Sequence, residues 1–375
     1  MKLSPVLAQQ IVHDIHDVLH QEINFMDENG LIIASTDFNR INQIHEGAQI
    51  VIQSKKQLTI HSDHQYEGTR KGINMPVFFD HEVIGVIGIT GDEKDVLYYG
   101  QILQKMTQIL IRDAYDRDIR NQKRTNDRLW IEQLIQARDD PHLHPSFHTI
   151  QNHAFQFLYA IPSRPMNAGQ IEQVHRLTES PTYAEMIQKK AIYSSEMILL
   201  INKTPLQKID SLIDAAKKIA DEIYWGIGNT YEEKKALYTA YQQAKQSAIW
   251  GKRILHIPLI AYEKSELGML VPWLTQQDNT PFLQSVFHSL PQEKIMSILS
   301  FLDLYEQANG SLKKAAEIGN MHKNTIQYKI LQIIQETGYD PRQYHDFTIL
   351  KTAALLYRYK YELNLQKNSA YHWTI

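Results

Sequence analysis

The chain has 375 residues, of which 43% are hydrophobic and 22% charged, and its formal net charge at pH 7 is -3. This length is too great for one ordinary hydrophobic core, so an ordered protein of two or three domains is expected. Cysteine is absent, which excludes disulfides, thiolate catalysis and thiolate metal sites. No secretory leader is predicted, and the most apolar stretch, residues 75–90, is broken by Asp80, His81 and Glu82. We therefore expect no membrane span and a cytoplasmic location.

The N-terminal region alternates between helical and strand patterns. One helical face over residues 4–20 carries Val6, Leu7, Ile11, Ile15, Val18 and Leu19. The short runs INFMD and LIIAS follow, separated by Glu28-Asn29-Gly30, which is a strong hairpin signal. A helix is expected over residues 38–53, then the strands NMPVFFD and EVIGVIGIT around a second polar turn. The order predicts a PAS-like or GAF-like sensor, an antiparallel sheet with helices on one face.

Two segments of this region resemble a known domain. Residues 23–48, INFMDENGLIIASTDFNRINQIHEGA, and residues 70–91, RKGINMPVFFDHEVIGVIGITG, are similar to the sugar diacid recognition domain of the carbohydrate diacid regulator family. The resemblance covers almost all of residues 3–120 and implies a ligand that is a small sugar-derived acid. The chain departs from the family pattern at Thr36 and Asn42, where members have Gly or Ser and Gly. Both changes fall in the candidate pocket, so the exact ligand can differ.

A pocket for a hydroxylated acid needs charged or amide donors for the carboxylate and groups that donate and accept for the hydroxyls. The candidate ligand-binding residues are Arg40, His45, Glu46, Arg70, Gly72 and Asn74. In this set the arginines, the histidine and the asparagine are donors, the glutamate can accept from a hydroxyl, and the glycine permits close backbone approach. The alternatives are surface arginines, a histidine satisfied within the core, and an asparagine that only shapes the strand entry before proline.

Two groups of histidines have spacings that merit a metal hypothesis. The first comprises His13, Asp14, His16, Asp17 and His20. These residues lie opposite the apolar face of the first helix, so a solvated surface is the better interpretation. The second comprises His142, His144 and His148. This second group lies beside Pro141 and Pro145 and is typical of a polar linker, so no metal and no cofactor are predicted.

A long helical pattern runs from Tyr98 to Ala137, without proline and without glycine after Gly100. A long amphipathic helix that leaves a sensor commonly pairs with its twin. We expect it to form a homodimer and to transmit the signal. The alternative is a single helix that packs on its own domain.

The region 148–262 alternates strand and helix patterns, which predicts an α+β or α/β layer. In place and shape it resembles the degenerate GGDEF-type domain found in the middle of this family, with residues 193–197 at the position of the catalytic Gly-Gly-Asp-Glu-Phe. Only Glu196 of that motif remains. A cyclase needs the glycines for close approach to its nucleotide and carboxylates for magnesium. Catalysis is therefore not expected, and the domain is predicted to be a spacer or a dimer scaffold.

Residues 311–330, SLKKAAEIGNMHKNTIQYKI, predict two short helices joined by a tight turn at Gly319-Asn320, both residues being tolerant of positive φ. The apolar inner positions of the two helices are Ala315, Ala316 and Ile318, then Met321, Ile326, Ile330 and Ile333. Asn324, Thr325 and Tyr328 fall on the opposite side, flanked by Lys323, Gln327 and Lys329. This is the helix-turn-helix pattern, whose second helix lies in the major groove. Four lysines and one glutamate give this segment a charge of +3, in a chain whose total is -3.

The same segment resembles the C-terminal helix-turn-helix of purine-catabolism-type and sugar-diacid-type regulators. Their pattern has two alanines, then His-Arg-Asn-Thr-Leu-x-Tyr-Arg-Leu, then Thr-Gly-x-Asp. The matching residues here are His322, Asn324, Thr325, Tyr328, Thr337, Gly338 and Asp340. Lys323 and Lys329 stand where the pattern has arginine, and lysine cannot make the bidentate contact to guanine. These two lysines are therefore predicted to bind phosphates.

Together the patterns predict a multidomain α+β protein. It comprises a sensor over residues 1–120 whose helix continues to 138, a degenerate GGDEF-like domain over 148–262 and an all-helical DNA-binding domain over 280–362. The predicted function is a bacterial transcription regulator that binds a hexose diacid or glycerate and double-stranded operator DNA; the resemblance implies an activator of diacid uptake and catabolism genes. The alternatives are a cyclic-dinucleotide enzyme and a sensor module whose helix-turn-helix contacts a protein.

Overall fold

The computed structural model describes residues 3–137, 150, 153–276 and 278–361. The chain divides into two compact units, 1–123 and 124–375, which meet within one long helix. Among the described helices, none combines the length and the apolar character needed to cross a bilayer.

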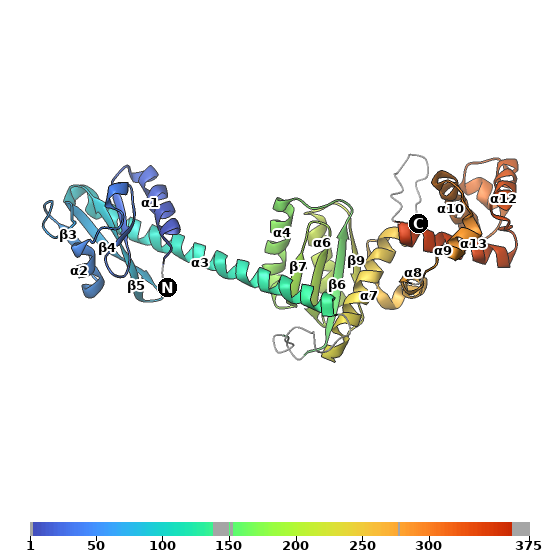
Figure 1. Cartoon of the computed structure of the whole chain (residues 1–375), viewed down its shortest axis with the longest axis horizontal. Helices are drawn as coiled ribbons and strands as arrows, with labels where there is room; N and C mark the ends of the chain where they lie inside the picture. Colours follow the sequence, from blue (N-terminus) through green and yellow to red (C-terminus); the bar gives the residue numbers. More distant parts are fainter. Residues whose placement is uncertain (1–2, 138–149, 151–152, 277, 362–375) are drawn as a thin grey trace. The chain divides into compact units, whose positions relative to one another are not determined.

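The first unit is built on an antiparallel sheet with the strand order β2-β1-β5-β4-β3 (Figure 1). Its strands are β1 (Ile23–Met26), β2 (Ile32–Ser35), β3 (Leu58–Ile60), β4 (Gly72–Phe79) and β5 (Glu82–Thr90). Its helices are α1 (Pro5–Leu19), the 3-10 turn η1 (Phe38–Arg40), α2 (Glu46–Ser54) and the first part of α3 (Glu93–Ala137). Both predicted hairpins are present, and the short edge strand β3 is an addition to the prediction.

Helices cover both faces of this sheet, whereas one covered face was expected. Side chains alternate between the faces of a strand. Phe25 and Ile87 therefore point to the face on which α1 and α3 pack, while their neighbours Met26 and Val86 point to the face covered by α2. The sheet is apolar on the whole of the first face and apolar only under α2 on the second.

Two predictions about these helices were wrong. In α1, Val6 and Val18 are 81% and 66% exposed, and Ala8 and Val12 are buried in their place. The helix expected over residues 38–53 is two separate elements, η1 and α2. The break occurs where Asn42 adopts a left-handed φ of 69°, and the chain after it forms an isolated β-bridge to the first hairpin instead of continuing a helix.

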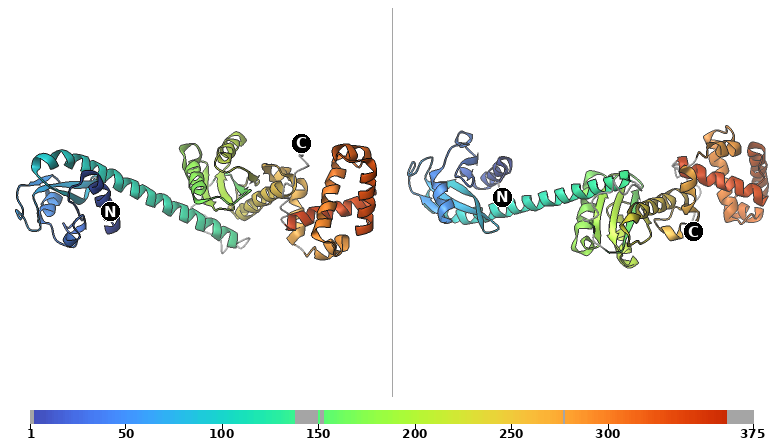
Figure 2. Two further views of the ribbon diagram at one scale, coloured as in Figure 1. Left: turned by 90° about the horizontal axis from the view of Figure 1, so that it is seen from above. Right: turned by 60° about the horizontal axis from the view of Figure 1, so that its bottom comes forward.

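Helix α3 is one unbroken helix in both views of Figure 2 and begins at Glu93 rather than at Tyr98. Within the first unit it contributes Leu103 and Ile111 to the core. Its opposite side carries a short exposed apolar strip of Ile102, Met106 and Ile109.

The second unit contains a sheet with the order β10-β9-β6-β8-β7, in which β10 and β9 are parallel and the other neighbours antiparallel. Its strands are β6 (Phe155–Pro162), β7 (Ile187–Ile192), β8 (Met197–Asn202), β9 (Ile223–Ile227) and β10 (Leu259–Ala261). Helices α4 (Ala168–Glu179) and α6 (Leu206–Lys217) pack on one face, while the end of α3 and α7 (Leu237–Trp250) pack on the other. These are the three layers of the predicted α/β region.

A charged network fastens the end of α3 to this sheet. Arg124 binds both carboxylate oxygens of Glu179 at 2.8 Å and a carboxylate oxygen of Glu172 at 2.8 Å. The buried Lys190 of β7 donates to Glu179 and to the hydroxyl of Thr178, each at 2.9 Å. Two further contacts from α3 are Lys189–Asp127, at 3.0 Å, and Tyr193–Glu132, at 2.9 Å. The carboxylate of Glu179 therefore forms ion pairs with both Arg124 and Lys190.

The remainder of the described chain is helical. Its principal helices are α8 (Val271–Gln276), α9 (Thr280–Phe287), α10 (Gln292–Gln307), α11 (Leu312–Ile318), α12 (Lys323–Thr337) and α13 (Tyr344–Tyr361). One apolar core joins α9 to α13, and its largest fully buried side chain is Phe287. This core holds α11 and α12 in the helix-turn-helix arrangement.

Candidate functional site

A row of polar side chains crosses the α2-covered face of the first sheet. Ser35, Asn24, Gly88 and Asn74 are paired in register across β2, β1, β5 and β4, so their side-chain positions share one face. The hydroxyl of Ser35 donates to Oδ1 of Asn24 at 2.7 Å, and both residues are buried. The predicted site did not include Asn24, although a single amide inside the apolar run INFMD was a signal for it. This row forms the floor of the candidate site.

Arg40, at the end of η1, is a buried cation whose charge acts on His45. It is only 6% exposed, and its Nη2 donates one hydrogen bond, of 2.6 Å, to the carbonyl of Gly68. Within the described residues it forms no ion pair. Burial lowers the pKa of Arg40, and the neighbouring charge of Arg70 lowers it further. A buried charge without a partner is costly, so a carboxylate placed here would be bound strongly.

Arg70 occupies a different electrostatic position. Its guanidinium donates to Glu22 at 2.5 Å and to Asp37 at 3.1 Å, and its side chain is 39% exposed. These two carboxylates lie one row beyond Asn24 and Ser35. Hydrogen bonding to Glu22 raises the pKa of Arg70, so its charge is already compensated by the protein.

His45 and Asn74 present donors beside the start of α2. Nδ1 of His45 caps the helix by accepting from the N–H of Ala48 at 3.1 Å. The neutral ring therefore carries its proton on Nε2, which is a donor. Asn74 is 3% exposed, and its Nδ2 has no hydrogen-bond partner among the described residues. A Cβ built on Gly47 would lie 3.1 Å from Nδ2 of Asn74 and 3.2 Å from Cε1 of His45. The two side chains thus converge on the bare Cα of Gly47.

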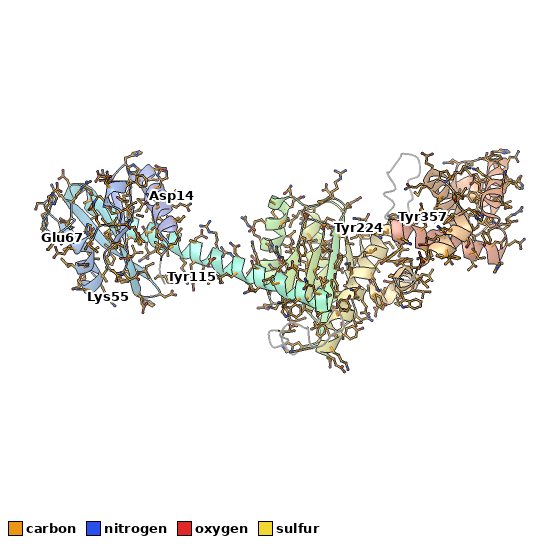
Figure 3. The ribbon with its side chains drawn as sticks, in the orientation of Figure 1. Asp14, Lys55, Glu67, Tyr115, Tyr224 and Tyr357 are labelled. Carbon is orange, nitrogen blue, oxygen red and sulfur yellow. The ribbon has the colours of Figure 1, made fainter. Side chains whose placement is uncertain are left out.

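The other two predicted ligand residues already have roles within the fold. The carboxylate of Glu46 accepts from the N–H of Glu67 at 2.8 Å and ties the loop before β4 to α2. Figure 3 labels Glu67 on that loop. A Cβ on Gly72 would lie 1.9 Å from the carbonyl oxygen of Ile89, so pairing with β5 accounts for this glycine. A ligand role for Glu46 and Gly72 stays a prediction.

Two groups of histidines were considered as metal ligands, and the structure describes only the group on α1. Among the described residues there is no group of three or more His, Asp or Glu side chains placed to hold a metal. Asp14, labelled in Figure 3, lies on the exposed side of α1. His142, His144 and His148 lie outside the described residues.

Protonation of His45 is expected to oppose folding below neutral pH. Burial lowers the pKa of His45 to about 4, whereas the pKa of a histidine in an unfolded chain is about 6.5. Between these values the unfolded chain binds the additional proton, so the free energy of unfolding falls as pH falls, by on the order of 3 kcal/mol once pH is below 4. His175 has its pKa lowered to about 4 for the same principal reason and adds a slope of the same sign.

His45→Asn keeps a helix-capping oxygen and removes the titration. Urea unfolding followed by circular dichroism from pH 7 to pH 4 should show a smaller loss of stability than in the wild type. His13→Asn, on the exposed side of α1, is the matched control and should retain the wild-type slope. An unchanged slope in His45→Asn would contradict the prediction.

The helix-turn-helix begins with a capped α11, because the hydroxyl of Ser311 accepts from the N–H of Lys314 at 3.3 Å. Only Asn320 of the turn uses positive φ, at 48°; Gly319 has a φ of -76°. The glycine is required for packing instead, since a Cβ there would lie 2.7 Å from Cε of Met321 and 3.0 Å from Cδ2 of Leu304. The predicted turn is confirmed, with a different reason for its glycine.

Helix α12 presents the predicted contact residues to solvent. His322 caps it through Nδ1, which accepts from the N–H of Asn324 at 3.3 Å. The exposed predicted residues are His322, Lys323, Asn324, Thr325, Gln327 and Tyr328, and Lys329 is half-buried. The side chain of Tyr328 is 68% exposed. The opposite side buries Ile326, Ile330 and Ile333, as predicted. Ile318 of α11 was expected inside and is 42% exposed, because the inner face of that short helix is filled by Ala315.

The residues after the contact helix end it and redirect the chain. The hydroxyl of Thr337 donates to the carbonyl of Ile333 at 2.7 Å, and Gly338 takes the left-handed C-terminal position with a φ of 80°. Asp340 then binds the guanidinium of Arg342. The Thr-Gly-x-Asp pattern therefore fixes the entry into α13.

Comparison with known proteins assigns a domain family to each of the two regions. Residues 3–134 match the model of a putative sugar diacid recognition domain, and residues 298–356 match that of the PucR C-terminal helix-turn-helix domain. The uncharacterised protein YsfB of Bacillus subtilis (strain 168) is 26% identical over 90% of this chain and 94% of its own length. The carbohydrate diacid regulator of Escherichia coli (strain K12) is 22% identical over 94% of this chain and 98% of its own.

A third relative matches a shorter part. The proline-responsive transcriptional activator PutR of Bacillus subtilis (strain 168) is 30% identical over 33% of this chain and 32% of its own length. The chain therefore belongs to a family of transcription regulators and not of enzymes: it is homologous to the carbohydrate diacid regulator, and it joins a putative sugar diacid recognition domain to a PucR-type helix-turn-helix domain.

Proposed function

We propose that this protein is a ligand-responsive regulator whose first unit binds a small hydroxylated carboxylic acid and whose helix-turn-helix binds operator DNA. The observation that carries the ligand class is Arg40, a buried guanidinium with no carboxylate partner among the described residues. A ligand carboxylate would supply the missing counter-charge and a planar acceptor for its remaining N–H groups. Two relatives are named for carbohydrate diacids and for proline, all of which carry carboxylates.

The proposed DNA interface is the exposed side of α12. Asn324 and Tyr328 offer side chains that reach base edges, while Lys323 and Lys329 offer charge for phosphates. The helix-turn-helix matched over residues 298–356 supports this assignment. A regulator of this kind acts on the chromosome, so we place it in the bacterial cytoplasm. As the resemblance implies, we propose that it activates transcription of acid uptake and catabolism genes.

We propose the domain limits 1–120 with its helix to 138, 148–262, and 280–362. The strand order of the first sheet supports a PAS-like or GAF-like sensor. For the second we propose a degenerate GGDEF-like scaffold without catalysis. Its β7–β8 hairpin has Glu196 in place, and the hydroxyl of Tyr159 binds that carboxylate.

We propose that α3 carries the signal and that the protein is a homodimer. Its exposed strip of Ile102, Met106 and Ile109 has the i, i+4, i+7 spacing of a helix-pairing seam. An acid that binds one arrangement of the paired helices more tightly shifts the population toward it, and only by that difference in affinity. The spacing of the two DNA-binding units would change with that population.

The test is calorimetric unfolding of the whole protein with glycerate, lactate, glucarate, galactarate and a neutral hexose. An acid that binds only the native state raises the unfolding free energy by about 2.7 kcal/mol at one hundred times its dissociation constant. Arg40→Met keeps the length of the side chain and should abolish the shift. Arg112→Met removes the same charge from an exposed position on α3 and should retain it. No shift with any acid would overturn the proposal.

A further inference from the structure

We propose that the sensor selects hydroxylated acids with a single carboxylate, held by Arg40, and reads an oxygen of the hydroxylated end with Asn74 and His45. This inference rests on the acid-binding function proposed above and defines its ligand more narrowly. It predicts that diacids of equal size bind more weakly.

The first argument is the balance of charge over the sheet. Arg40 and Arg70 contribute two positive charges, and Glu22 and Asp37 contribute two negative charges, so the four side chains sum to zero. Their charges act on one another, because Arg70, Glu22 and Asp37 all influence the ionisation of Arg40. Of these two arginines, only Arg40 lacks a carboxylate partner among the described residues. One ligand carboxylate completes its pairing, whereas a second would add a negative charge near Glu22 and Asp37, which already share Arg70.

The second argument is the donor pair beside α2. Asn74 is 97% buried, as its 3% exposure shows, and its unpaired Nδ2 is directed at Gly47 in the first turn of the helix. Nδ2 of Asn74 and Nε2 of His45 are donors only, so they require an acceptor oxygen. Neither carries a formal charge at neutral pH. A hydroxyl or carbonyl oxygen therefore satisfies them without an additional negative charge.

The orientation of the asparagine is set by glycines on both sides. A Cβ on Gly88 would lie 2.6 Å from Oδ1 of Asn74, and one on Gly47 would lie 3.1 Å from its Nδ2. Any side chain at Gly88 would displace the amide. Gly47 and Gly88 thus leave the space in which the donor of Asn74 is directed toward the start of α2, where the helix dipole also favours an oxygen with negative character.

The first experiment compares glycerate with tartronate by titration calorimetry on the full chain. The two molecules share a carbon skeleton, and a hydroxymethyl group in one is a carboxylate in the other. Glycerate should bind at least tenfold more tightly. Glu22→Gln removes one negative charge and breaks one of the two ion pairs of Arg70. It should therefore reduce the ratio of glycerate to tartronate affinity by about tenfold. Glu82→Gln makes the same charge change at the far end of the β4–β5 hairpin and should leave the ratio unchanged.

The second experiment compares lactate with propionate, which differ by one hydroxyl. The wild type should prefer lactate at least tenfold, and Asn74→Leu should reduce that preference to near one. Unfolding without acid controls for misfolding: the amide nitrogen lost has no partner within the described residues, so the melting temperature of Asn74→Leu should be close to that of the wild type.

The outcomes separate this inference from the function on which it rests. If no acid binds, both are overturned. If acids bind through Arg40 but tartronate binds as tightly as glycerate or more tightly, acid sensing stands and the selection for one carboxylate is overturned. If lactate and propionate bind equally, the role of Asn74 and His45 is overturned.

Discussion

Glu179→Gln is expected to destabilise the second unit by about 3 kcal/mol or more, because it leaves two partly buried cations without their shared carboxylate. Arg124 binds both oxygens of Glu179, and Lys190 binds one of them while only 4% exposed. Burial by itself raises the pKa of Glu179, but the hydrogen bonds from Arg124 and Lys190 outweigh it and lower the pKa to about 2. The carboxylate is thus charged in the folded protein at every ordinary pH.

The measurement is urea unfolding followed by tryptophan fluorescence. All of the chain's tryptophans follow residue 124 in the sequence, so the signal reports the second unit. Glu172→Gln is the matched control: it also removes a carboxylate from Arg124, but Glu172 is 43% exposed and solvent screens its charge. We expect Glu172→Gln to lower the free energy of unfolding by less than about 1 kcal/mol. If both variants lost the same amount of unfolding free energy, the double pairing of Glu179 would not be what stabilises the network.

The pH dependence of this pairing has a definite sign. The folded pKa of Glu179 lies below that of an unfolded glutamate, so its contribution is complete above about pH 4.3 and is lost as pH falls toward 2. Loss of the contribution weakens the attachment of α3 to β7 and α4, although Lys189–Asp127 and Tyr193–Glu132 remain. If α3 transmits the ligand signal as proposed, Glu179→Gln should also weaken the effect of the acid on operator binding while leaving acid affinity unchanged.

Asn324→Ala and Tyr328→Ala are each expected to lower operator affinity by about ten- to a hundredfold, equivalent to about 1–3 kcal/mol for a base contact. Affinity for a scrambled duplex of the same length should change little, since that binding depends on phosphates. Gln335→Ala, at an exposed position of the same helix about three turns from Asn324 and two from Tyr328, is the matched control. The assay is fluorescence anisotropy with a duplex selected from a random pool. If a variant lost the same affinity for the selected duplex as for the scrambled one, a role of that residue in base recognition would be contradicted.

Salt distinguishes a DNA interface from a protein-binding one. Counterion release makes DNA affinity fall by roughly 10³ or more between 50 and 200 mM salt for several phosphate contacts. Lys323→Gln should weaken binding to all duplexes alike and reduce the magnitude of the salt slope by about 1. A flat salt dependence in the wild type would favour a protein partner for the exposed side of α12.

Much of the DNA-binding unit could be predicted from the sequence because its determinants are local. The buried stripe Ile326, Ile330 and Ile333 follows helical periodicity, and the cap at Ser311 and the C-terminal glycine at 338 act over three or four residues. The failure at Ile318 is also local: it is the last residue of α11, and only Ala315 of that helix is buried.

The sensor site was less accessible to prediction, because its residues meet only through strand register. Asn24 and Asn74 are fifty positions apart, and the pairing of β1, β5 and β4 places them in one row. Resemblance and residue chemistry identified Arg40, His45, Arg70 and Asn74 as candidates. They did not show that Arg40 is buried without a carboxylate partner while Arg70 holds two.

The sequence by itself determined the two hairpins of the first sheet, the helix-turn-helix with its exposed polar side, and the resemblance to a regulator family. These features depend on periodicity, helix caps and motifs, each of which involves residues that are close together in the sequence. Only the tertiary structure decided which charges are compensated and which donors are buried without partners. The distinction between Arg40 and Arg70, and the direction of the Asn74 amide, depend on what the folded chain brings alongside each group. Desolvation and pairing act through space rather than along the sequence.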